Sequence, residues 1–324
     1  MVAMSTAVRP PGPVMSTGRL RSVAKAVAGA GILLAILLAV GAEPFLRGLA
    51  AVSVVSVVAA VMLGAAATSA AAWRWRILAG RLGLPLGWGE SMSAYYRSQF
   101  LNSVLPGGVV GDVHRAFAHG RTVSTVPQAS RAVVAERMAG QAVQLFLAAV
   151  VLVSIGMTAY APAVGIVVLA VAVACVGLVL AAAVSVRARV ALRHELATLR
   201  FAFGTPGTLV KVFAASLVVI LGHVATFVIA CIAVGVEASP PRLAAVALIA
   251  VLAGSIPLNI AGWGPREGAA AWAFAAAGLG ATAGLAASTA FGVLALVAVA
   301  PGAAVVAASA LHVRRIARGE EPSA

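Results

Sequence analysis

The sequence predicts an all-α, polytopic integral membrane protein with about six full spans and two opposed re-entrant helical hairpins, eight helical membrane segments in total. Composition is the first reason, because 62% of the 324 residues are hydrophobic, only 10% are charged and the mean hydropathy is +1.05. Soluble domains usually carry roughly 25% charged residues. Several apolar runs also approach or exceed the roughly 20 residues that are needed to cross a bilayer. Two further apolar stretches are interrupted by proline and glycine, which break helices.

Six uninterrupted segments predict full spans: residues 24–42, 49–72, 133–157, 162–186, 209–236 and 283–311. The first of them resembles a signal peptide, but its length and the spans that follow favour a retained helix. No segment is long and polar enough for a soluble domain. We therefore expect one membrane domain over residues 19–315, preceded by a disordered tail (1–18) and followed by a cytoplasmic tail (316–324).

The two interrupted segments, about 88–111 and 243–280, are predicted to enter the membrane and return on the same side. Basic residues favour the cytoplasmic side of a membrane. If residues 88–111 turn back, eight basic residues that follow them face the cytoplasm: Arg115, Arg121, Arg131, Arg187, Arg189, Arg193, Arg200 and Lys211. The second segment must then enter from the outer face, so that both termini lie inside. Opposed broken helices that meet near the midplane form the substrate site of inverted-repeat transporters.

Each hairpin carries a proline-glycine motif that also contains an acid and an arginine. The first motif is Leu105-Pro-Gly-Gly-Val-Val-Gly-Asp-Val-His-Arg115, and the second is Ile256-Pro-Leu-Asn-Ile-Ala-Gly-Trp-Gly-Pro-Arg-Glu267. Irregular backbone and ionised groups are tolerated at membrane depth where they line a protein cavity. Glycines also let backbone amides approach an anion closely. The motifs therefore indicate a polar substrate within the membrane.

Three acidic residues fall within predicted membrane segments, and each has a basic neighbour in the sequence: Asp112 with Arg115, Glu136 with Arg137, and Glu267 with Arg266. One interpretation is that these are structural ion pairs that hold the hairpins in place. The other is that the arginines bind a phosphate through their planar fork while the acids orient them or relay protons. The residues alone leave both interpretations open.

The third span is predicted to have one polar face. Glu136, Gly140 and Gln144 recur at every fourth position, with Arg137 and Gln141 one step further round. At about 100° per residue these five positions fall within about 140° of arc. This face must point to protein or water rather than to lipid.

Other residues receive simpler interpretations. His223 is expected to be a packed, hydrogen-bonded residue of an apolar span, and Glu195 to form a local ion pair in a basic cytoplasmic loop. Trp263, between two glycines, is a candidate to close over a ligand. Aromatic residues favour membrane interfaces, which predicts interfacial anchors at Trp73, Trp75 and Trp88 and places Tyr95, Tyr96 and Arg97 at the cytoplasmic mouth of the first hairpin.

Several function classes are excluded by the sequence. The net charge of +14 does not indicate nucleic acid, because the basic residues lie between apolar runs rather than in a patch with aromatics. No catalytic-triad, zinc-protease, CxxC or nucleotide-binding motif occurs, and Asp112 is the only aspartate, so a double-aspartate metal site cannot form. Cys175 and Cys231 are expected to be packing residues. We expect no cofactor, no metal, and transport that is downhill or coupled to an ion gradient.

The motifs, in their order and approximate spacing, resemble the signatures of the membrane domain of lysylphosphatidylglycerol synthases, a flippase-like family. The similar elements are Asn102, Leu105-Pro-Gly, Gly111-Asp112 with Arg115, Glu136-Arg137, and the segment from Ile256-Pro to Glu267. The resemblance covers roughly residues 20–315. In bifunctional members this domain moves an aminoacylated phospholipid between leaflets, and a soluble C-terminal aminoacyltransferase makes that lipid. Only 13 residues follow Leu311, so a stand-alone member is expected. The resemblance implies lipid translocation and leaves polyprenyl-phosphate and glycolipid substrates open.

We therefore expect a protein of the inner (cytoplasmic) membrane, with both termini in the cytoplasm, that moves an anionic phospholipid or a polyprenyl-phosphate-linked lipid between leaflets. The alternatives are a membrane-embedded transferase on a lipid phosphate, or a non-transporting partner of an envelope-synthesis enzyme. Expected partners are a membrane lipid and envelope-biosynthesis enzymes, and not nucleic acid. The candidate substrate-binding residues are Asn102, Pro106, Gly107, Gly108, Gly111, Asp112, Arg115, Glu136, Arg137, Gln141, Pro257, Gly262, Trp263, Gly264, Arg266 and Glu267.

Overall fold

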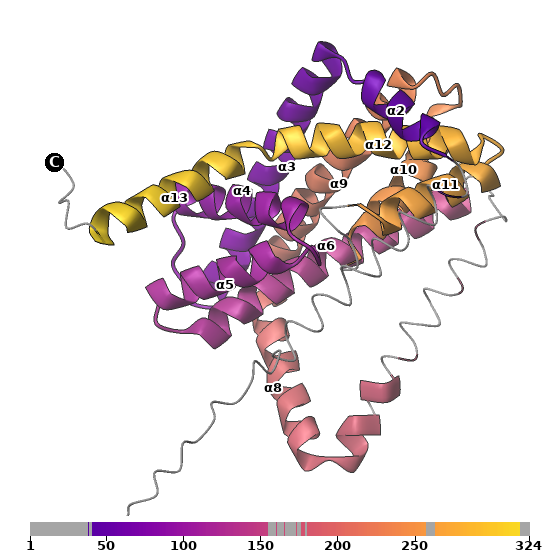
Figure 1. The fold of residues 1–324 in the computed structure, drawn as a ribbon. Coiled ribbons are helices and arrows are strands. Elements are labelled where there is room, and N and C mark those ends of the chain that lie inside the picture. The colour runs from indigo at the N-terminus through magenta and orange to yellow at the C-terminus, as the bar shows by residue number, and fades with distance from the viewer. Residues whose placement is uncertain are drawn as a thin grey trace, which may run out of the picture.

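The fold is a bundle of helices (Figure 1). The computed structural model describes residues 38, 41–154, 160, 165, 173, 176–178, 180–256 and 263–317, with side chains as far as residue 311. The helices bounded within these ranges are α2 (Glu43–Ala50), α3 (Val54–Arg81), α4 (Trp88–Val104), α5 (Val110–Thr122), α6 (Val126–Ser154), α8 (Val186–Phe203), α9 (Pro206–Ala233), α10 (Pro240–Gly254), α11 (Pro265–Ala276), α12 (Ala281–Ala298) and α13 (Pro301–Ala317).

Within the described residues, α3, α6, α9 and α12 are long and apolar enough to cross a membrane. An all-α protein with several membrane-crossing helices is therefore confirmed. The span predicted for residues 24–42 and most of that for 162–186 lie outside the described residues. The segment predicted as one span over 283–311 is divided into α12 and α13. The division falls at Pro301, which has no N–H to donate and whose ring clashes with a carbonyl one turn earlier.

Helix α3 begins and ends later than the predicted span over residues 49–72. Ser53 caps it, since its hydroxyl accepts a hydrogen bond from the Ser56 N–H and its own N–H donates to the Ser56 hydroxyl at 2.9 Å. No proline lies between Ala72 and Arg81, and the helix continues through Gly80. The Trp73-Arg-Trp-Arg segment therefore continues the helix instead of lying in a loop.

Helices α3 and α9 pack against each other in antiparallel directions. Arg74, near the end of α3, donates to the hydroxyl of Ser216 in the first half of α9 at 2.8 Å. Further along α9, Gly222 faces Ala67, which lies earlier in α3. The chain folds back into α4 after the end of α3, and into α10 after the end of α9. The two following helix pairs therefore start at opposite ends of this central pair.

Helices α4 and α5 form the first hairpin. Glu90 near the start of α4 lies 3.6 Å from His119 near the end of α5, and at the other end the Asn102 side chain accepts the Gly111 N–H at 2.7 Å. The connecting turn contains Gly107 and Gly108 at φ +96° and +61°, a backbone region that favours glycine. The chain therefore folds back after α4, but the returning arm is α5, most of which lies beyond the predicted segment of residues 88–111.

Helices α10 and α11 form the second hairpin. Arg242 at the start of α10 donates to the Ala277 carbonyl just after the end of α11. At the opposite end, Gly254 of α10 faces the aliphatic part of the Arg266 side chain, which a Cβ added at Gly254 would approach to 3.5 Å. Residues 257–262, which connect the two helices, lie outside the described residues.

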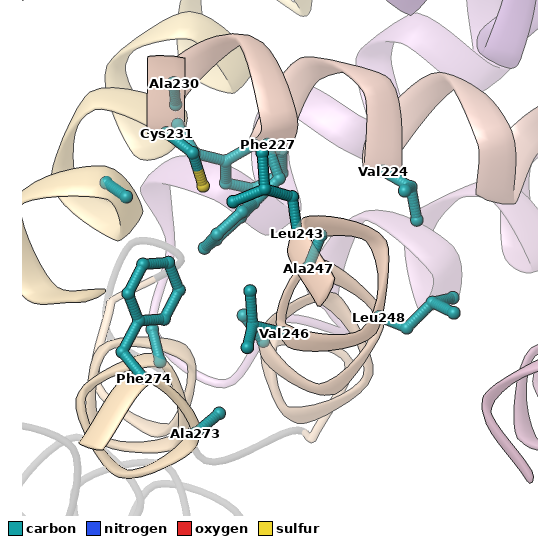
Figure 2. Close-up of a cluster of buried hydrophobic side chains, with 14 of the residues drawn as sticks. Val224, Phe227, Ala230, Cys231, Leu243, Val246, Ala247, Leu248, Ala273 and Phe274 are labelled. Atoms are coloured by element: carbon teal, nitrogen blue, oxygen red, sulfur yellow. The ribbon is translucent and has the colours of Figure 1, made fainter. Parts of the chain in front are cut away.

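A buried apolar cluster fixes the second hairpin against α9 and α12. Figure 2 shows Phe227 and Cys231 of α9 beside Val246 of α10 and Phe274 of α11. The ring of Phe227 lies 6.4 Å from that of Phe274 and 5.3 Å from that of Phe291 in α12. Alanines fill much of the remaining contact, which lets the helices approach closely. This packing determines where the polar start of α11 lies.

Helix α8 lies at one end of the molecule, apart from most of the bundle (Figure 1). Its acidic residue Glu195 pairs with Arg131 of α6 at 2.8 Å. The predicted ion pair of Glu195 is thus formed with another helix instead of a local residue. Both side chains remain partly exposed.

Candidate functional site

Glu136 is the centre of a buried polar network that joins four helices. Its carboxylate is fully buried. Oε1 accepts hydrogen bonds from Arg74 Nε of α3 and from the Tyr95 hydroxyl of α4, both at 2.9 Å. Oε2 accepts from Arg115 of α5 at 3.0 Å. One residue of α6 thereby fixes the positions of α3, α4 and α5.

Asp112 is the second carboxylate of this network. Its Oδ1 accepts from the Ser98 hydroxyl at 3.0 Å and from Arg115 at 3.1 Å. Its Oδ2 accepts from the Asn102 amide at 3.1 Å and also from Arg137 of α6. Asp112 therefore holds the tip of the first hairpin together and attaches it to α6.

The predicted pairing of acids and arginines is only partly correct. Asp112 pairs with Arg115 as predicted, but Glu136 pairs with Arg74 and Arg115, while Arg137 pairs with Asp112. Consecutive side chains leave a helix about 100° apart, so residues 136 and 137 point to different neighbours. The prediction that Glu136 pairs with its neighbour Arg137 was therefore wrong.

Three members of the network were not among the predicted site residues. Trp75 was expected at the membrane interface and Tyr95 at the mouth of the hairpin, and Arg74 was not a candidate, yet all three are 5% exposed or less. The Arg115 guanidinium lies 4.5 Å from the ring centroid of Trp75 and 4.2 Å from that of Tyr95. Such contacts stabilise a buried cation. The available signal was the absence of proline between Val54 and Arg81.

A second cluster forms at the start of α11 and confirms the predicted pair of Arg266 and Glu267. Arg266 donates to Glu267 Oε1 from two nitrogens, at 2.9 and 2.6 Å. The Ser288 hydroxyl of α12 donates to the same oxygen at 3.1 Å, and the Gly264 N–H donates to Oε2 at 2.7 Å. The Arg266 guanidinium lies 5.4 Å from the ring centroid of Trp263. The candidates Pro257 and Gly262 lie outside the described residues.

A cavity of about 300 Å³ connects the two clusters. Arg74 and Arg137 line it from the first cluster, and Arg266 lines it from the second. The tips of both hairpins also reach it, through Asn102, Ser103 and Gly108 on one side and Gly254 and Ser255 on the other. The candidates Pro106, Gly107, Gly111, Asp112, Arg115, Glu136, Trp263, Gly264 and Glu267 are not among the lining residues.

The polar face predicted for the third span borders this cavity. Arg137, Gly140, Gln141 and Gln144 of α6 all line it, which confirms that the face points into the protein. Gly140 leaves room for an arginine, because a Cβ there would lie 3.0 Å from the terminal nitrogens of Arg74.

His223 of α9 also lines the cavity. Its imidazole has no hydrogen-bond partner among the residues that the structure describes, so the partner expected for it is not found there. Its imidazole is a polar group on an otherwise apolar stretch of α9.

The first network has one more positive than negative charge. The guanidinium groups of Arg74, Arg115 and Arg137 face the carboxylates of Asp112 and Glu136, three charges against two. The pair at the start of α11 is neutral. This excess of positive charge makes the cavity electrostatically suited to an anion.

Comparison with known proteins identifies a family. Residues 22–302 match the family model described as the Lysylphosphatidylglycerol synthase TM region. The matched range contains every helix from α2 to α12, and with them both polar clusters and the cavity. No curated protein and no solved structure gives a significant match. Because the match covers most of the chain, this is a membrane protein that belongs to the lysylphosphatidylglycerol synthase TM-region family.

Proposed function

We propose that the protein moves a lipid with an anionic headgroup between the leaflets of the cytoplasmic membrane. The observation that carries this proposal is the cavity between the two hairpin tips, whose charged wall residues are arginines from both polar clusters. The family of the chain is named for a domain of lipid-synthesising proteins, which supports a lipid as the substrate.

The headgroup phosphate would be held by Arg137, with Arg74 and Arg266 on either side of it. The Arg137 side chain is 44% exposed although it lies inside the bundle, and Asp112 is its hydrogen-bond partner among the described residues. The remaining donors of its planar fork are suited to two phosphate oxygens. The acyl chains can stay in the bilayer while the charged head crosses through protein, which avoids the high cost of a charge in lipid.

The two hairpins would open the cavity to the two sides in turn. They start at opposite ends of the antiparallel α3–α9 pair, and their tips meet at the cavity. In our proposal α4 and α5 enter from the cytoplasm, and α10 and α11 enter from the outer face. Opposed broken helices with a site between them are a common architecture for alternating access.

Arg115 would act from behind the cavity wall. It is 1% exposed, contacts Asp112 and Glu136, and stacks on Trp75 and Tyr95. In this position it holds the carboxylates that orient Arg74 and Arg137, and it does not need to touch the headgroup.

The test is lipid movement in vesicles that contain the purified full chain and a trace of fluorescent phosphatidylglycerol. Arg137→Gln should slow movement by at least about tenfold, corresponding to about 1.4 kcal/mol. Arg121→Gln is the matched control, because Arg121 is an exposed residue of α5. Equal movement with wild type, Arg137→Gln and empty vesicles would refute translocation. A new lipid species without movement would instead indicate a transferase.

A further inference from the structure

The carboxylates of the two clusters lie behind the arginines and not on the cavity wall. The charged residues that line the cavity are Arg74, Arg137 and Arg266, and none of the acidic residues that the structure describes lines it. Glu136 and Glu267 are fully buried, and the Asp112 side chain is 11% exposed. A headgroup in the cavity therefore meets guanidinium groups first.

These three carboxylates each already accept several hydrogen bonds from protein donors. Glu136 accepts hydrogen bonds from two nitrogens of Arg74, from Tyr95 and from Arg115. Asp112 likewise accepts four hydrogen bonds. Glu267 accepts four as well. A carboxylate offers about four lone-pair sites, so most of this capacity is used by the protein. An ammonium group that entered the cavity would meet guanidinium groups, with no carboxylate on the described wall to pair with it.

The rest of the polar wall consists of neutral groups, prominent among them side-chain amides. Gln99, Asn102, Gln141 and Gln144 line the cavity. Gln99 accepts a hydrogen bond from the Thr68 hydroxyl at 2.9 Å. Asn102 donates to Asp112 and accepts from the Gly111 N–H. In contrast, Gln141 Oε1 and Gln144 Nε2 are buried and have no hydrogen-bond partner among the described residues.

A free amide oxygen and a free amide nitrogen on one helix face fit a group that both donates and accepts hydrogen bonds. Hydroxyl groups do both. A buried polar atom without a partner costs about 1–3 kcal/mol, so a ligand that satisfied Gln141 and Gln144 would bind more tightly. A volume of about 300 Å³ is at the lower end of small-molecule pockets and suits a headgroup rather than a whole lipid.

We infer that the cavity selects a phosphodiester headgroup that carries an uncharged, hydroxyl-bearing group, such as glycerol or a sugar, and rejects headgroups that carry an ammonium. This inference rests on the proposed function, because it names the substrate class of the same site. An aminoacylated headgroup carries ammonium groups, and the described wall offers them no carboxylate.

Binding and movement of defined lipids test the inference separately. The probes are phosphatidylglycerol and a hexosyl polyprenyl phosphate, two sources of the proposed chemistry, against phosphatidylethanolamine and lysylphosphatidylglycerol. Binding is measured as thermal stabilisation of the full chain in detergent, and movement is measured in vesicles. At least one hydroxyl-bearing anionic lipid should bind about tenfold more tightly than both ammonium lipids. Equal or tighter binding of an ammonium lipid, or no binding of either anionic lipid, would overturn the inference. Selective binding without movement would refute only translocation.

A substitution that adds a carboxylate to the wall provides a second test. Gln144→Glu should reduce the preference for phosphatidylglycerol over phosphatidylethanolamine by about tenfold. Gln128→Glu is the matched control, because it adds the same charge to an exposed position of α6. If Gln144→Glu does not fold, Gln141→Glu replaces it, and the comparison of lipids with the wild-type protein stands by itself. An unchanged preference in the folded variant would contradict the inference.

Discussion

Arg74 and Glu136 are 62 residues apart in the sequence, yet their side chains form a buried ion pair that ties α3 to α6. The same guanidinium donates to Ser216 of α9 at 2.8 Å and lines the cavity. Arg74 therefore links three helices and is also part of the cavity wall. The structural and ligand-binding interpretations of the acid–arginine pairs are therefore compatible. In one network the guanidinium groups line the cavity, and the carboxylates lie on the side of them away from the cavity.

Glu136→Ala should destabilise the protein strongly. The substitution leaves Arg74 and Arg115 buried without their shared carboxylate, and breaking a buried pair typically costs about 3–5 kcal/mol. Thermal unfolding in detergent measures the effect. Glu195→Ala is the matched control, since the Arg131–Glu195 pair is partly exposed and should contribute only about 0–1 kcal/mol. Equal stability of the two variants would show that Glu136 is not a structural centre.

Much of the site could be predicted from local sequence because proline, glycine and charge are conspicuous in an apolar chain. Asp112 with Arg115, and Arg266 with Glu267, were found by short spacing, and both pairs form. The polar face of α6 followed from helix periodicity. These features depend on residues no more than about two turns apart.

Features that depend on distant contacts could not be predicted in the same way. The partner of Glu136 lies on another helix, and only the packing of α3 against α6 reveals it. Trp75 and Tyr95 are residue types that favour membrane interfaces, but here both are buried. Their rings contact the Arg115 guanidinium, and the Tyr95 hydroxyl donates to Glu136. The long apolar run over residues 283–311 predicted a single span, whereas Pro301 divides it into α12 and α13.

Arg137→Lys and Arg266→Lys should separate binding from folding. Lysine keeps the charge but loses the planar fork, so two phosphate oxygens can no longer be bound side by side. We expect near-normal abundance and thermal stability, with lipid movement in vesicles at least about tenfold slower. Arg121→Lys, at an exposed position of α5, serves as the control. Normal movement with both variants would favour a purely structural role for these arginines.

Gly292→Ala should disturb the cavity through a single methyl group. A Cβ at this position of α12 would lie 2.5 Å from a terminal nitrogen of Arg266 and 3.2 Å from the ring of Trp263. The Arg266 guanidinium must therefore shift from its present position. Lipid movement should fall more than thermal stability does. Gly89→Ala is the control, because its added Cβ would meet nothing within 4 Å. Unchanged movement with Gly292→Ala would mean that the position of Arg266 is not critical.

Cysteine labelling tests the proposed arrangement of the hairpins in the membrane. In a background that lacks Cys175 and Cys231, single cysteines replace Thr122 at the end of α5, Thr198 in α8 and Ala238 before α10. The basic residues around the first two positions favour the cytoplasm, while Ala238 follows the opposite end of α9. An impermeant thiol reagent added to intact cells should label only Ala238→Cys, and permeabilised cells should label all three.

The pattern of labelling distinguishes the possible topologies. Labelling of Thr122→Cys from outside would mean that α4 and α5 together cross the membrane, and the two hairpins could not then enter from opposite faces. Protection of Ala238→Cys would place both hairpins on the cytoplasmic side. Either result would leave the cavity in place but remove its proposed access from two sides, since alternating access requires one gate on each face of the membrane.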